Sequence, residues 1–76
     1  MKVKDGTRGM SDTDSRSVEA LCIFLEDFPD VTEVDIEPME RGYKIRANKR
    51  SGEPKFSAFG SSIVDAINHL VRIAVA

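Results

Sequence analysis

The side chains best suited to catalysis are the only histidine and the only cysteine, His69 and Cys22. An imidazole base beside a thiolate nucleophile could serve covalent catalysis. Cys22, however, falls in a run of apolar residues at helical spacing, where a cysteine is a small and inert core residue. His69 falls beside Asp65 and Arg72 on the polar side of a predicted helix. We therefore expect a protein that is not an enzyme, with catalysis through His69 as an alternative.

Three carboxylates that could bind Mg²⁺ or Ca²⁺ alternate along one predicted strand: Glu33, Asp35 and Glu37. Basic residues predicted across the sheet, Arg46 and Arg50, would form salt bridges with them instead. One cysteine and one histidine cannot complete a zinc site. Gly60-Ser61-Ser62 at a helix start falls short of a phosphate-binding glycine-rich loop. We expect neither a metal nor a cofactor.

Composition limits the classes of protein to which this chain could belong. A chain of 76 residues, 41% hydrophobic and 32% charged, has room for one globular domain. The longest apolar run, Leu21 to Leu25, is far below the roughly 20 residues that cross a membrane, so we expect a cytoplasmic protein with no membrane partner. A single cysteine excludes an internal disulfide framework. The net charge of −2 is not the basic signature of a nucleic-acid-binding protein.

Hydrophobic periodicity predicts an α+β fold of two layers, with the order α-β-β-β-α. Residues 1–13 have no periodicity and are expected to form a flexible N-terminal tail, followed by one domain over residues 14–76. The expected elements are a helix that begins at Ser15 and ends before Pro29, strands over 30–39, 43–48 and 55–59, and a final helix that reaches the C-terminus. The final helix begins at Ser62, where Asp65 completes a capping box. Both helices should cover one face of a three-stranded antiparallel meander.

Two-residue turns at Arg41-Gly42 and Ser51-Gly52 would set the strand register. They place Ile36 opposite Ala47, and Ala47 opposite Phe56, so that the apolar residues of all three strands share one face. On the other face Glu33 would oppose Arg50, and Glu37 would oppose Arg46. The acidic stretch before residue 41 and the basic stretch after it would then neutralise each other across the sheet.

The order of elements from Ser15 to Ala76 resembles the double-stranded-RNA-binding domain. That family binds phosphates with lysines at the start of its second helix, but this chain has no lysine there, from Ser61 to Asp65. The family's first helix contacts RNA, but in this chain that helix has acidic residues that would repel phosphate: Glu19, Glu26 and Asp27. The resemblance therefore implies the fold and, as for degenerate members of the family, a role in protein interaction. In general character the chain is similar to small virus-encoded inhibitors of host defence such as anti-CRISPR proteins.

We accordingly predict a protein-interaction module that acts by stoichiometric binding as an inhibitor, adaptor or regulatory subunit. One predicted partner-binding surface is an apolar island of Met39 and Phe59 around the stem of Lys44. A second is formed by cations of the basic stretch, with Lys49 and Arg50 next to the Ser51-Gly52 turn: Arg41, Lys49, Arg50 and Lys55. Lys49, Lys55 and Arg41 should be unpaired. Phe59 could instead fold back as a lid on the second helix. The alternative function is nucleic-acid binding by the basic hairpin between the second and third strands.

A second apolar seam on the last helix predicts a homodimer. Its members, spaced near 3.5 residues, are Val64, Asn68, Val71 and Val75. A polar residue inside such a seam often fixes the register of two helices. The alternative is that the seam packs against the first helix.

Overall fold

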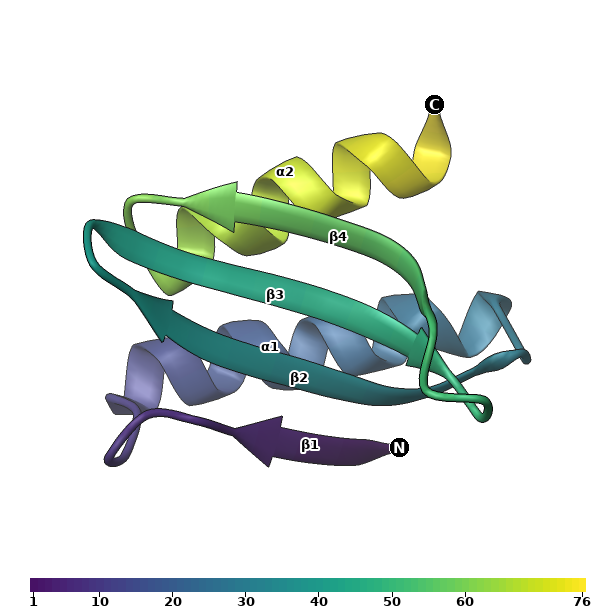
Figure 1. The fold of residues 1–76 in the computed structure, drawn as a ribbon, viewed down its shortest axis with the longest axis horizontal. Helices are drawn as coiled ribbons and strands as arrows, with labels where there is room; N and C mark the ends of the chain where they lie inside the picture. Colours follow the sequence, from purple (N-terminus) through teal and green to yellow (C-terminus); the bar gives the residue numbers. More distant parts are fainter.

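A computed structural model describes residues 1–76 as a single layer of helices packed on a single sheet (Figure 1). The elements, in chain order, are β1 (Lys2–Asp5), α1 (Asp12–Phe24), a 3₁₀ turn (Leu25–Asp27), β2 (Val31–Met39), β3 (Gly42–Lys49), β4 (Pro54–Gly60) and α2 (Ile63–Val75). The predicted α+β class and the α-β-β-β-α order are therefore present. An additional strand precedes them.

Both helices begin at a serine cap. The Ser11 hydroxyl accepts a hydrogen bond from the Asp14 backbone N–H at 3.1 Å, so α1 starts three residues before the expected Ser15. The Ser62 hydroxyl accepts from the Asp65 N–H at 3.1 Å, as the spacing of these two residues predicts. Asp12 and Asp14 in the first turn of α1 complement the positive end of its dipole.

The sheet has four strands in the order β1-β2-β3-β4, and this corrects the expected three-stranded meander. β2, β3 and β4 are antiparallel as expected, but Lys2–Asp5 pairs in parallel with β2. Lys2 lies opposite Glu33, with 3.9 Å between Nζ and Oε1, and Lys4 lies opposite Asp35. All four residues of β1 are exposed, so backbone pairing and charge hold this strand rather than burial.

The β2–β3 register differs from the prediction by two residues. Met39 pairs with Gly42, so Glu40 and Arg41 form the turn, and Ile36 faces Ile45 instead of Ala47. Since side chains alternate with a period of two, this even shift leaves every apolar residue on its predicted face. The β3–β4 register is as predicted from Tyr43 to Ala47, and a bulge then shifts it before Asn48.

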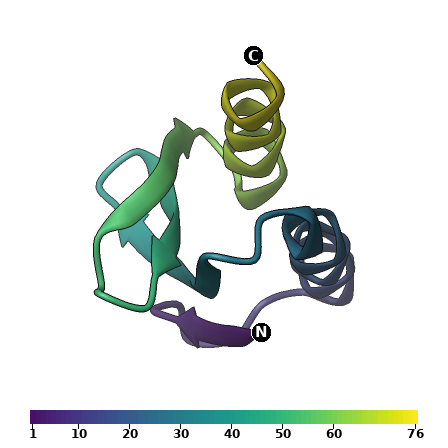
Figure 2. The same ribbon diagram turned by 90° about the vertical axis from the view of Figure 1, so that its right-hand side faces the viewer.

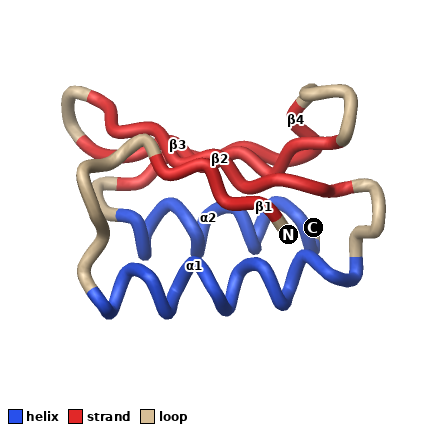
Figure 3. The backbone as a smooth tube through the Cα atoms, turned by 90° about the horizontal axis from the view of Figure 1, so that it is seen from below, coloured by secondary structure: helices blue, strands red, loops and turns tan.

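Both helices cover the same face of the sheet and run in the same direction (Figures 1 and 2). The core lies between the layers and comprises Val18, Leu21, Leu25, Val31, Val34, Ile36, Ile45, Ala47, Ala58, Ile63, Ala66, Ile67 and Leu70. Phe28 closes one end of it against Phe56, with ring centroids 5.1 Å apart in an edge-to-face pair. The other face of the sheet is uncovered, and both hairpin turns curve toward that open face (Figure 3).

Candidate binding site at a corner of the sheet

The open face carries a charge ladder centred on Arg46. Its guanidinium donates to Asp35 Oδ2 at 3.1 Å and to Glu37 Oε1 at 2.7 Å, and the Glu37 carboxylate is the main cause of the raised pKa of Arg46. The predicted contact between Glu37 and Arg46 is therefore present, as a diagonal pair. The predicted opposition of Glu33 and Arg50 is wrong, because Glu33 lies opposite Asn48 and forms its ion pair with Lys2.

Two lysines expected to be unpaired have acidic partners. Lys55 Nζ is 2.7 Å from Asp30 Oδ2, and Lys49 Nζ is 3.8 Å from Glu53 Oε2. Lys55 falls in the bulged start of β4, outside the alternation that the prediction assumed. Its hydrogen bond lowers the pKa of Asp30, so any stability from this exposed pair is present above the ordinary aspartate pKa and is lost as the pH falls through the lowered value.

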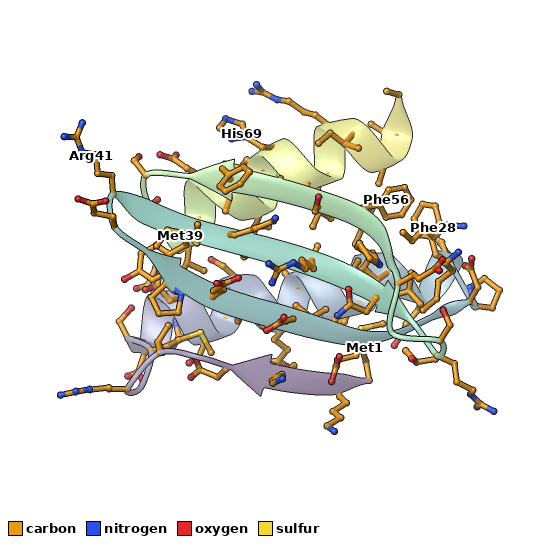
Figure 4. The ribbon with its side chains drawn as sticks, in the orientation of Figure 1. Met1, Phe28, Met39, Arg41, Phe56 and His69 are labelled. Carbon is orange, nitrogen blue, oxygen red and sulfur yellow. The ribbon has the colours of Figure 1, made fainter.

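The predicted apolar island lies at the corner of the sheet where the β2–β3 turn meets the end of β4. Met39 is 43% exposed and Phe59 is 57% exposed, so Phe59 does not fold back as a lid on α2. Between them is a hollow of about 250 Å³ that we call the corner site, lined by Met39, Arg41, Gly42, Tyr43, Phe59 and Gly60. In Figure 4, Met39 and Arg41 lie at the same end of this hairpin.

Lys44 lies opposite Phe59, as the register predicted, and its Nζ is 5.0 Å from the centre of the Phe59 ring. Met39 lies opposite Gly42 rather than opposite Lys44, yet the two-residue shift keeps it at the same corner. The cation over the ring face restrains both side chains. The sequence thus located Met39, Lys44 and Phe59 at one place, and the structure adds Arg41 to them.

Two glycines, Gly42 and Gly60, complete the lining of the corner site, although they were expected only in a turn and at a helix junction. Gly42 has φ of +151°, and a Cβ there would be 2.2 Å from the Gly60 carbonyl oxygen. Gly42 is therefore glycine because of a close approach between strands rather than because it forms the turn. The backbone of both glycines borders the hollow, and Tyr43 lies beside Gly42 in the lining.

His69 and Cys22, the two residues considered for catalysis, both make contacts that hold the fold together. His69 Nδ1 is 2.6 Å from the Phe59 carbonyl oxygen, a hydrogen bond that links α2 to the end of β4 near the corner site (Figure 4). Cys22 packs against the core, and burial is the main cause of its raised pKa. No group of three or more His, Cys, Asp or Glu side chains could hold a metal ion.

The predicted dimer seam lies mostly between the helices. Val64, Asn68 and Val71 line a hollow of about 230 Å³ whose other wall includes Ala20 and Phe24 of α1. Val71 also packs against the core, whereas Val75 is 66% exposed. The seam thus faces α1 over most of its length and reaches solvent at Val75.

Comparison with protein-family profiles, curated proteins and solved structures gives no match to this chain. Neither helix has the length and apolar character needed to cross a membrane.

Proposed function

We propose that this chain is a non-enzymatic protein-interaction module that binds a partner protein stoichiometrically through the corner site. The observation that carries the proposal is the exposure of Phe59 and Met39 on either side of a hollow. Aromatic anchors that fill or border pockets dominate the energetics of many interfaces, because a ring buries a large area with little loss of side-chain freedom.

The corner site is also held in place before any partner arrives. Lys44 lies over the ring of Phe59, and His69 binds the carbonyl of the same residue. Restraint of an anchor in the free protein lowers the ordering cost of association. An inhibitor, an adaptor or a regulatory subunit would each use such a site in the same way.

The Phe59→Ala variant tests the proposal. Because the ring is more than half exposed, we expect a stability loss below about 1 kcal/mol, with loss of partner binding. The matched control is Ile23→Ala, which removes a side chain of similar exposure (61%) from α1. The protein and both variants would be used as baits in the native host lysate, and affinities would then be measured with the recovered protein. A partner that binds Phe59→Ala as tightly as the unmodified chain would refute the proposal.

Nucleic-acid binding by the basic hairpin is the alternative, and the ion pairs count against it. Arg46, Lys49 and Lys55 each contact a carboxylate, and Arg41, Lys44 and Arg50 are the hairpin cations without one. Binding of duplex RNA or DNA that weakens steeply with salt would favour this alternative over the first.

We further propose self-association through α2, and Val75 is the residue that tests it. Aspartate at the half-buried Val71 would disturb the core as well as any interface, so it is a poor probe. Light scattering should find a dimer for the unmodified chain and for Ile73→Asp, a control at another exposed position of α2, and a monomer for Val75→Asp. A monomeric unmodified chain at high micromolar concentration would contradict this proposal.

A further inference from the structure

Two cations at the corner site have no carboxylate partner, as is also the case for Lys4 and Arg50 elsewhere on the surface, but the two at the corner lie beside a hollow with exposed apolar walls. Lys2, Arg46, Lys49 and Lys55 all have a carboxylate within ion-pair distance. Arg41 lines the hollow, and the ammonium of Lys44 lies over the Phe59 ring at its edge, yet neither forms an ion pair. Two positive charges at this corner are therefore free to interact with a ligand.

The two carboxylates of β2 next to the corner face two other cations, Arg46 and Lys4. Glu37 lies opposite Lys44, but its Oε1 accepts a hydrogen bond from the guanidinium of Arg46 at 2.7 Å. Asp35, two residues away on the same face of β2, accepts a hydrogen bond from the same guanidinium and lies opposite Lys4 of β1. Glu40 shares the turn with Arg41 and is exposed, without an ion pair. The corner thus combines two cations with one solvated carboxylate.

The apolar part of the site has room for a single large side chain. Its volume of about 250 Å³ is below the 300 Å³ or so at which small-molecule pockets begin. Met39 and Phe59, which share the open face, supply the apolar walls, and Gly42, Tyr43 and Gly60 complete the lining. One aliphatic or aromatic residue of a partner would fit here, next to Arg41 and Lys44.

We infer that the partner presents a segment in which a large apolar side chain is flanked by acidic side chains. This inference rests on the proposed function and specifies the partner's chemistry. The apolar residue fills the hollow while the flanking carboxylates lie against Arg41 and Lys44. A basic segment would place like charges together, which lowers affinity and slows encounter, so the same two cations select between partners.

Chemical-shift titration of the ¹⁵N-labelled chain with capped peptides tests the inference. The three probes have the central sequences Asp-Leu-Glu, Lys-Leu-Lys and Asp-Gly-Glu. We expect Asp-Leu-Glu to shift the amides of Gly42, Tyr43, Phe59 and Gly60, and to bind roughly tenfold more tightly than either other peptide. In the Arg41→Glu, Lys44→Glu double variant, Lys-Leu-Lys should become the preferred ligand.

The matched control is the Lys4→Glu, Arg50→Glu double variant, which changes net charge equally at two exposed cations outside the corner site and should keep the original preference. Shifts at the corner amides with no preference for the acidic peptide would overturn the inference and leave the proposed site standing. If no peptide shifts the corner amides, or if shifts occur only elsewhere, both the inference and the proposed site fail.

Discussion

Replacing Gly60 with alanine is expected to remove most of the protein's free energy of unfolding. A Cβ at this position would lie 2.2 Å from the backbone nitrogen of Ala66 and 2.7 Å from its Cα. Both atoms belong to α2, so the clash can be relieved only if the helix moves away from β4. That movement would open the core at Ile63, Ala66 and Leu70. We expect a loss of about 3 kcal/mol or more, where a domain of this size has about 3–5 kcal/mol in total.

Thermal unfolding followed by circular dichroism measures this loss. Gly52→Ala is the control, because φ is +94° there but no atom lies within 4 Å of the added Cβ. Backbone strain alone should cost this control about 1–2 kcal/mol. A Gly60→Ala variant that melts within a few degrees of the unmodified chain would show that α2 is not seated on β4 as described.

Substitution of Asn48 by aspartate is expected to cost about 2–4 kcal/mol at neutral pH. Asn48 is 6% exposed, and its Nδ2 donates to Glu33 Oε2 at 3.3 Å. An aspartate would replace this donor with a buried carboxylate that faces the half-buried carboxylate of Glu33. Its other oxygen would occupy the place of Oδ1, which has no hydrogen-bond partner. Two facing carboxylates with one donor fewer are unfavourable when both are ionised.

The cost of Asn48→Asp should depend on pH in a defined direction. Burial and Glu33 would raise the folded-state pKa of the new carboxyl, which destabilises the fold above the ordinary aspartate pKa and spares it below. Urea unfolding at pH 4 and pH 7 should therefore show a larger difference from the unmodified chain at pH 7. Asn48→Leu, which removes both polar groups, should show no such trend. An equal loss at both values would contradict the expected repulsion by Glu33.

The periodic parts of the sequence were sufficient to predict most of the fold. The meander, the two helices and the β3–β4 register follow from patterns of period 2 and 3.6, which are local. β1 has no such signal, since all its residues are exposed and its pairing with β2 depends on the long connection through α1. The β2–β3 turn was predicted one residue too late because Gly42 was assigned to it. Gly42 is instead the first residue of β3, where the close approach of the Gly60 backbone requires a glycine.

The candidate site was predictable to the extent that it depends on strand pairing. Lys44 and Phe59 are neighbours by register, and Met39 stays near them because a two-residue shift preserves the face. The partner of Lys55 was not predictable, because Asp30 lies in a loop and Lys55 in a bulge. Neither position follows a repeating pattern, so only the folded chain brings the two residues together.

The exposure of β1 determines the order in which the sheet forms and opens. β1 contributes no residue to the core, and its docking requires closure of the loop through α1, whereas the meander and α2 form from contacts closer in sequence. We therefore expect β1 to be the last strand to join and the first to leave, so its amides should exchange with solvent before those of β3. Each departure exposes the outer backbone edge of β2, which is the condition under which copies of a chain can exchange strands.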